Sequence, residues 1–137
     1  MALTGGCLCG KVRYIIKADP LFVGVCHCTN CQKASGGAYS VNVGVKDVAL
    51  DLAGDLTTYV DHGDSGKEVL RRFCPVCGSP VITDVEAYPG IHVVKAGTLD
   101  DPGQVKPQRQ IFCASKHPWV PILDGIPAFD KAPAPVR

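Results

Sequence analysis

The sequence predicts a mainly β domain, a sandwich or a barrel, with very little helix. Three observations support this prediction: short runs of alternating apolar and polar residues, turn-forming residues between the runs, and a single stretch with helix signals. The chain has 137 residues, of which 46% are hydrophobic and 20% are charged, as in an ordinary globular protein. One domain of this length buries roughly 68% of the surface of its unfolded chain, so it can form a core without disulfides.

The expected strands follow one another along the chain. The first covers residues 11–16, where Val12, Tyr14 and Ile16 share one face, as in a strand with one buried side. Residues 39–45 alternate in the same way, from Tyr39 to Val45. Further β-rich runs follow at residues 56–60, 69–73, 81–83, 91–95 and 110–113. Turn-forming residues such as Pro89-Gly90 separate these runs.

One short helix is expected between the first two of these runs. It covers residues 29–35, with Thr29 as the N-terminal cap and Gly36-Gly37 ending it. At the other end of the chain, residues 126–137 carry three prolines and are expected to form an extended arm. The predicted organisation is therefore a single domain over residues 1–125 followed by a proline-rich arm over residues 126–137.

Seven of the eight cysteines gather in three clusters, spaced as C-x-C, C-x-C-x-x-C and C-x-x-C. The clusters are Cys7 and Cys9, then Cys26, Cys28 and Cys31, then Cys74 and Cys77. Such spacings recur at zinc sites. Two pairs make a site with four thiolates, and the triplet is one ligand short. A structural zinc is normally closed by four protein ligands, whereas a catalytic zinc keeps a position open. We therefore expect two zinc ions per chain, one structural and one catalytic.

The two pairs need tight turns to bring their sulfurs to one metal. Pro75 presets its own φ for such a turn, and Gly78 can adopt a positive φ. Residues i and i+2 of a regular strand lie about 6.6 Å apart, so the chain must kink between Cys7 and Cys9. The neighbouring glycines permit that kink. Pairing Cys7 and Cys9 with the later pair would staple distant parts of the sheet.

The triplet allows two interpretations. Its fourth position is either open to water or substrate, or closed by Cys113 or a histidine. We expect His27 to point away from the metal, since both neighbours are ligands, and Cys113 to be a core thiol in an apolar stretch. Three thiolates weaken zinc as a Lewis acid but suit a further soft ligand. A thiol held as thiolate can then add to a small carbonyl compound.

Charge and composition exclude other classes of protein. The formal net charge is +1, without a basic patch, so no nucleic-acid partner is expected. No apolar run approaches the roughly 18 residues of a membrane span, and the first residues do not resemble a signal peptide. We therefore expect a cytoplasmic protein with reduced thiols rather than a secreted protein with four disulfides.

Four motifs occur in order along the chain: GGCLCGKVRY, CHCTNCQKASGGAY, FCPVCGSP and IFCASKHPWVPILDGIPAFD. Their ordered combination resembles the glutathione-dependent formaldehyde-activating enzymes, a family that also contains centromere protein V-like proteins. The resemblance implies a β-rich fold, the β-tent, shared with small zinc-binding chaperone-like proteins. It implies a structural zinc on Cys7, Cys9, Cys74 and Cys77. It also implies a catalytic zinc on Cys26, Cys28 and Cys31.

The resemblance further implies a carbon–sulfur lyase that adds glutathione to formaldehyde, so the expected partners are a small thiol and an aldehyde. Lys116, Lys33 or Arg109 would steer the carboxylates of the tripeptide, and Trp119 would form a pocket wall. Two alternatives remain open at this point. One is a non-catalytic zinc module that binds protein or chromatin, with a closed triplet. The other is a zinc or redox sensor whose triplet loses metal when its thiolates are oxidised.

Overall fold

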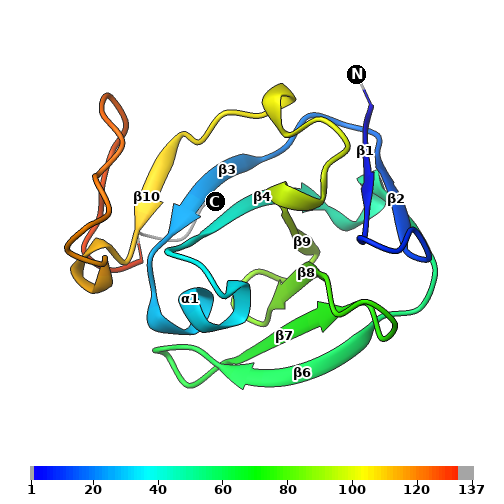
Figure 1. The fold of residues 1–137 in the computed structure, drawn as a ribbon, viewed down its shortest axis with the longest axis horizontal. Coiled ribbons are helices and arrows are strands. Elements are labelled where there is room, and N and C mark those ends of the chain that lie inside the picture. The colour runs from blue at the N-terminus through cyan, green and yellow to red at the C-terminus, as the bar shows by residue number, and fades with distance from the viewer. Residues whose placement is uncertain (1, 133–137) are drawn as a thin grey trace.

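The computed structural model describes residues 2–132 and confirms a mainly β fold with one α-helix. The strands form two sheets (Figure 1). The smaller sheet has the order β1-β2-β5, with β1 (Leu3–Gly6), β2 (Arg13–Ile16) and β5 (Leu50–Ala53). The larger has the order β10-β3-β4-β9-β8-β7-β6, with β3 (Phe22–Cys26), β4 (Ser40–Lys46), β6 (Thr57–His62), β7 (Glu68–Phe73), β8 (Pro80–Val85), β9 (Ile91–Lys95) and β10 (Arg109–Ile111).

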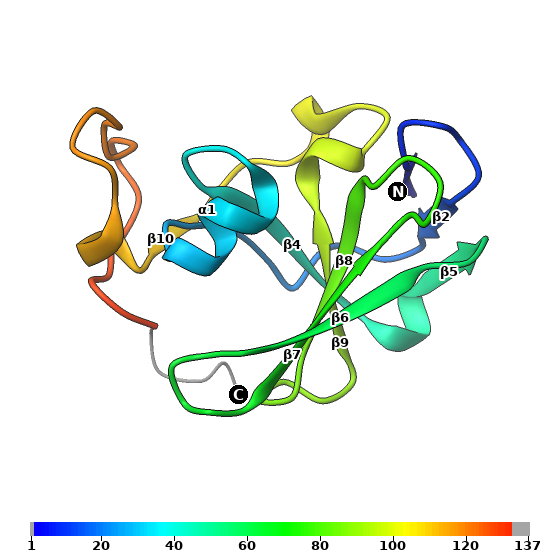
Figure 2. The ribbon, with the colours of Figure 1, turned by 60° about the horizontal axis from the view of Figure 1, so that its bottom comes forward.

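The helix α1 (Thr29–Ser35) lies between β3 and β4 in the chain. Four short 3-10 turns complete the described structure: η1 (Asp47–Ala49), η2 (Ala96–Thr98), η3 (Pro102–Gln104) and η4 (Cys113–Ser115). Figure 2 shows α1 near the top of the molecule and the loop between β8 and β9 at the bottom. Within residues 2–132, no helix has the length and apolarity that crossing a membrane requires.

The two sheets share one hydrophobic core. Tyr14 and Ile16 of the smaller sheet are at most 2% exposed, and they pack in the same cluster as Val43 and Val94 of the larger sheet. Strands β4 and β9 pair in the middle of the larger sheet, and Val43 faces Val94 across this pair. Burial of such side chains is the main favourable contribution to folding. The sheets therefore form a sandwich whose facing sides are apolar.

Local signals predicted some elements well and missed others. The helix and β9 have the bounds expected from the sequence. Strand β3 was not expected, because its apolar residues do not alternate: Val23, Gly24 and Val25 are buried in succession. Strand β1 was missed because two of its four residues are glycine, which is depleted in strands. Strand β5, with three exposed residues, gave no apolar pattern.

The last strand ends earlier than expected. The sequence predicted residues 110–113, but β10 ends at Ile111 and Cys113 begins η4. The reason is Phe112, whose φ of 55° is left-handed and breaks the extended backbone. Part of the predicted proline-rich arm then returns along β10: the Gln110 amide donates to Pro127 O, and the Phe129 amide donates to Gln110 O. Residues 133–137 of that arm lie outside the described residues.

Candidate metal centres

The first cysteine group is formed by two loops from different sheets. Cys7 and Cys9 lie between β1 and β2, and Cys74 and Cys77 lie between β7 and β8. All four sulfurs are within 4.8 Å of one another. The Cys7 and Cys9 sulfurs are 3.5 Å apart, and those of Cys9 and Cys74 are 3.8 Å apart. Tetrahedral zinc with bonds of about 2.3 Å places its sulfurs roughly 3.8 Å apart. The geometry therefore fits a four-thiolate zinc that joins the two sheets.

Each loop turns tightly behind its second cysteine. Gly10 and Gly78 have φ values of 82° and 77°, in the region that glycine tolerates best. The Gly10 amide donates to Cys7 O, and the Gly78 amide donates to Cys74 O. Backbone amides also point at the sulfurs, as Val12 N does to Cys7 Sγ at 3.3 Å and Val76 N does to Cys74 Sγ at 3.4 Å.

A serine beside the group favours its thiolate form. The Ser79 hydroxyl lies 3.2 Å from the sulfur of Cys77. Hydrogen bonds from the side chain and backbone of Ser79 lower the pKa of Cys77 to about 5. Amide and hydroxyl donors aimed at sulfur stabilise the anion, which is the form that binds metal. The Cys74–Cys77 loop therefore favours the thiolate form of Cys77.

The second cysteine group lies where β3 meets α1. Cys26 ends β3, Cys28 precedes the helix and Cys31 lies in its first turn. Their sulfurs are within 4.8 Å of one another. The prediction that Thr29 caps the helix is wrong. The N-terminal cap is Cys28, whose sulfur accepts a hydrogen bond from the Cys31 amide at 3.2 Å. A thiolate at a helix N-terminus meets free N–H groups, so the triplet and the helix start form one unit.

Among residues 2–132, no fourth cysteine, histidine or carboxylate joins the triplet. Cys113 belongs to neither group. Its backbone amide donates to Phe129 O, and burial raises the pKa of its thiol. His27 is 1% exposed, and its Nε2 lies 3.4 Å from Gln110 Oε1. None of the eight cysteines is paired in a disulfide.

A row of polar residues shares the sheet face that carries the Cys26 side chain. Cross-strand partners lie on the same face, as do residues i and i+2 of one strand. Cys26 pairs with Ser40 of β4, and Asn42, two residues further along β4, pairs with Lys95 of β9. Val93, two residues before Lys95, pairs with Thr83 of β8, and Thr83 pairs with Arg71 of β7. The row therefore consists of Cys26, Ser40, Asn42, Lys95, Thr83 and Arg71. The apolar core lies on the opposite face of the same strands.

Two cations of this row lie close to the triplet. Lys95 is partly buried, and its ammonium donates to Asn42 Oδ1 at 2.8 Å. Burial lowers the pKa of Lys95, while the sulfurs of Cys31, Cys26 and Cys28 oppose that shift. Burial also acts to lower the pKa of Arg71, but Asp61 and the sulfur of Cys31 raise it overall. Both cations therefore face the negative charge of the triplet.

Among the three cysteines of the triplet, only Cys31 has a lowered pKa, so the thiolate form is favoured there. Hydrogen bonds from Cys26 and Cys28 lower the pKa of Cys31, and Ser40 and Lys95 act in the same direction. Asp61 links α1 to β7: its carboxylate accepts hydrogen bonds from Asn30 Nδ2 of α1 and from Arg71 Nε of β7, each at 2.9 Å. The Arg71 side chain is only 15% exposed. The cations are thus held by the fold and are not loose surface groups.

The expected cations are placed differently. Lys33 is exposed on α1. The Arg109 guanidinium lies 4.7 Å from the centre of the Phe22 ring, and Lys116 Nζ donates to the carbonyls of His117 and Val120. Trp119 is 72% exposed, stacks on His117 at 4.8 Å and lines a cavity. Their proposed roles in steering a tripeptide stay predictions.

Lys95 and Arg71 were missed by sequence reasoning, although a signal exists. In the expected strand 91–95, Lys95 shares a face with Ile91 and Val93. In the strand 69–73, Arg71 likewise shares a face with Val69 and Phe73. A charge on the apolar side of a strand is costly unless it has a partner. That pattern could have marked both residues as candidates for a functional site.

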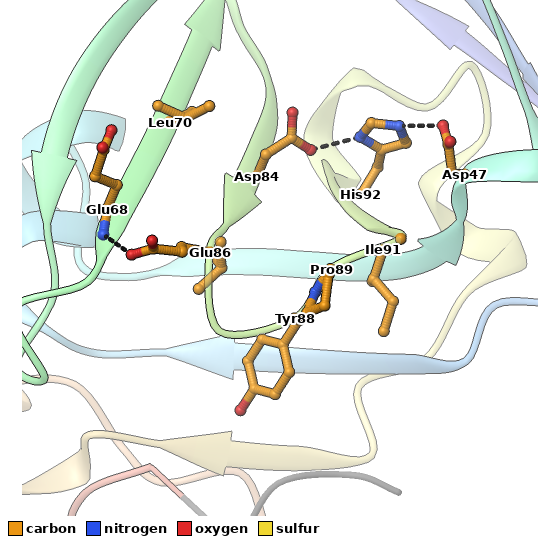
Figure 3. Close-up of a pocket in the computed structure, with 11 residues that line it drawn as sticks. Asp47, Glu68, Leu70, Asp84, Glu86, Tyr88, Pro89, Ile91 and His92 are labelled. Atoms are coloured by element: carbon orange, nitrogen blue, oxygen red, sulfur yellow. Dashed lines mark hydrogen bonds and ion pairs between the residues drawn. The ribbon is translucent and has the colours of Figure 1, made fainter.

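A separate polar cluster lies in a cavity of about 390 Å³ near the loop between β8 and β9. Figure 3 shows the His92 ring between Asp84 and Asp47. The distances are 2.5 Å from Nδ1 to Asp84 Oδ1 and 2.8 Å from Nε2 to Asp47 Oδ1. Burial acts to lower the pKa of His92, but the two carboxylates raise it overall.

This cluster gives a pH-dependent prediction. Because the folded-state pKa is raised, the stability from charged His92 is complete below the unfolded value of about 6.5 and is lost as pH rises through the folded value. We expect the difference in free energy of unfolding between wild type and His92→Asn to be largest near pH 6 and to shrink by pH 9. Urea unfolding at several pH values measures it. His62→Asn, at an exposed histidine, is the control; an equal difference at all pH values would contradict the prediction.

Two comparisons with known proteins gave a match, one to a family model and one to a solved structure. The sequence model of the family described as glutathione-dependent formaldehyde-activating enzyme matches residues 2–115. A crystal structure of a Rhodobacter sphaeroides protein superposes with a TM-score of 0.58 at 19% identity, covering 91% of this chain and 98% of that one. At this identity the likeness supports the fold alone. No curated protein matches the chain.

Proposed function

Because the chain belongs to the family of glutathione-dependent formaldehyde-activating enzymes, we propose that it is a zinc-dependent carbon–sulfur lyase. Its reaction would join a thiol, such as glutathione, to a small aldehyde, such as formaldehyde, and would also run in reverse. The observation that carries the proposal is the three-sulfur group of Cys26, Cys28 and Cys31, which no fourth ligand joins among the described residues. Three protein ligands are the pattern of a catalytic zinc.

The reaction balances without an oxidant or reductant. A bond forms between the thiol sulfur and the carbonyl carbon, and the carbonyl π bond breaks. The proton that leaves the sulfur ends on the former carbonyl oxygen, giving a hydroxymethyl thioether when the aldehyde is formaldehyde. The reverse reaction breaks the same carbon–sulfur bond and returns the proton to sulfur. The free thiols of the chain and this substrate suit a reducing compartment, so we propose a cytoplasmic location.

The residues of the polar row would complement the charge of this reaction. Zinc would supply a binding position for the substrate sulfur as thiolate. Cys26, Cys28 and Cys31 would hold the metal, and their three negative charges already exceed its two positive charges. A bound substrate thiolate would add one more negative charge. Lys95 and Arg71 face this position from the same sheet face, and opposite charges nearby favour the anion.

The proposal is tested by the rate of adduct formation. Zinc-loaded protein is mixed with glutathione and formaldehyde, and exchange of the labelled carbon between free and bound aldehyde is followed by NMR. We expect exchange faster than the spontaneous reaction, and we expect this gain to vanish in protein without its labile zinc. A second panel with other small thiols and aldehydes identifies the preferred pair. If zinc-loaded protein accelerates none of these pairs, the lyase proposal is wrong.

The charge argument predicts that Lys95→Met weakens thiol binding. A charge-assisted hydrogen bond contributes about 1.5–3 kcal/mol, so kcat/KM is expected to fall about 10- to 150-fold. Calorimetric titration of zinc-loaded protein with glutathione, without aldehyde, should show a comparable loss of affinity at unchanged zinc content. Lys67→Met, at an exposed lysine, is the matched control. Lys95→Arg keeps the charge and should recover part of the affinity. Wild-type affinity in Lys95→Met would contradict the role of this ammonium.

A further inference from the structure

A second cavity, of about 250 Å³, lies against the other side of the strand that carries Cys26. Val25 of β3 and Gln110 of β10 line it, together with Tyr39 and the segment that contains Trp119 and Leu123. Figure 1 shows β3 and β10 side by side, with the later part of the chain next to β10. Successive side chains of a strand point to opposite faces, so Val25 and Cys26 face different sides. The cavity is therefore separate from the proposed thiol site.

The walls of this cavity are mainly apolar, and one buried polar atom has no partner. Among the described residues, no group hydrogen-bonds to His27 Nδ1. The His27 side chain lines the cavity, and the residue is 1% exposed. The Tyr39 ring packs against the imidazole in a T-shaped arrangement with centroids 5.3 Å apart, but it gives Nδ1 no hydrogen bond. A buried polar atom without a partner is unfavourable and needs an explanation.

The neighbouring hydrogen bonds define what His27 Nδ1 needs. Gln110 Nε2 donates to Leu123 O at 3.1 Å, and Gln110 Oε1 accepts from Leu123 N at 3.3 Å. This reciprocal pair fixes which end of the Gln110 amide is oxygen. That oxygen also lies 3.4 Å from His27 Nε2, so Nε2 carries the proton that it donates. In the neutral ring Nδ1 is then an acceptor. It needs a donor.

We propose that this cavity binds a small, mainly apolar molecule that carries one hydrogen-bond donor, such as an aromatic alcohol. The ring or alkyl part would fill the space between Val25, Leu123 and the aromatic side chains, and the hydroxyl or N–H group would donate to His27 Nδ1. An apolar cavity of about 150 Å³ is already large enough for benzene, so the size suits one substituted ring. The proposal does not depend on the lyase reaction, because the thiol site lies on the other face of β3.

Trp119 is the only tryptophan of the chain and lines the cavity, so its fluorescence reports directly on binding. We would titrate the zinc-loaded full chain with phenol and, separately, with toluene, which has the same number of heavy atoms but no donor. Excitation near the red edge of tryptophan absorption avoids both ligands. We expect saturable changes with both and about fivefold tighter binding of phenol, as one net hydrogen bond provides.

Two matched variants locate the binding. Ala38 lines the cavity, so Ala38→Leu fills part of the space and should abolish the response to both ligands. Ala34→Leu makes the same change at an exposed position of α1 and should leave the response unchanged. No saturable response in wild type, or an unchanged response in Ala38→Leu, would overturn the inference. Equal affinities for phenol and toluene would also overturn it, because an internal water would then satisfy His27 Nδ1.

Discussion

We expect that replacing Cys74 with Ser leaves the chain unfolded or insoluble. Cys74 is 1% exposed, and its sulfur lies 3.8 Å from that of Cys9 in the four-cysteine group. This group joins the loop between β1 and β2 to the loop between β7 and β8, and so links the two sheets. Structural zinc contributes on the order of 10 kcal/mol to folding, whereas the net stability of a domain is about 5–15 kcal/mol. A site with three sulfurs and a hydroxyl cannot supply enough of that energy.

The measurement is circular dichroism and soluble yield of Cys74→Ser beside wild type, with zinc counted per chain. Cys113→Ser is the matched control, since Cys113 lies in neither cysteine group and should give a folded protein with two zinc ions. Adding a zinc chelator to wild type should reproduce the loss of structure. A soluble Cys74→Ser protein with a wild-type spectrum would show that the four-cysteine group does not hold the fold.

For Cys31→Ser we expect the opposite result: the chain should fold, but one zinc and the proposed catalysis should be lost. The triplet lies at the junction of β3 and α1 and does not connect the two sheets. The core side chains lie on the other face of the large sheet, so this change leaves them in place. Metal-ion catalysis is worth several kcal/mol, so activity is expected to fall by a factor on the order of 100 or more.

The measurement combines zinc content, thermal unfolding and the exchange assay on the same sample. We expect zinc to fall from two ions to one with the unfolding cooperativity retained. Cys113→Ser again serves as the control and should keep both ions and full activity. Full activity in Cys31→Ser would remove the triplet from the mechanism, whereas loss of the fold would make the triplet a second structural site.

Local sequence signals account for much of the fold. The helix was predictable because Gly36-Gly37 ends it, and β9 because its residues are apolar and bounded by a turn. Strand β3 was not predictable from local signals. It is buried on both faces, so its sequence shows no alternation of apolar and polar residues. The division of seven cysteines into a group of four and a group of three followed from spacing alone, and the structure brings both groups together.

The surroundings of the triplet were harder to predict, because they come from five strands, β4 and β6 to β9. Asn42 and Lys95 meet across a strand pair although 53 positions separate them in the chain. Register decides such contacts, and a shift of one residue would move Lys95 to the opposite face. Of the expected cations, Arg109 begins the last strand and Lys116 follows it, but the Arg109 guanidinium and the Lys116 ammonium have other contacts. The sequence could mark Lys95 and Arg71 by their place on the apolar side of a strand, but it could not show that both reach the triplet.

The distance along the chain between the two cysteine pairs determines when the four-cysteine group can first form during synthesis. Cys9 and Cys74 are 65 positions apart, and ribosomes add about 5–20 residues per second, so about 3–13 s separate their appearance. During that interval Cys7 and Cys9 have no second pair of thiols to share a metal with, so a metal ion cannot yet join the two sheets. The nascent chain therefore depends on its surroundings to keep Cys7 and Cys9 reduced until Cys77 emerges. Zinc can join the two pairs only after Cys77 has been added to the chain.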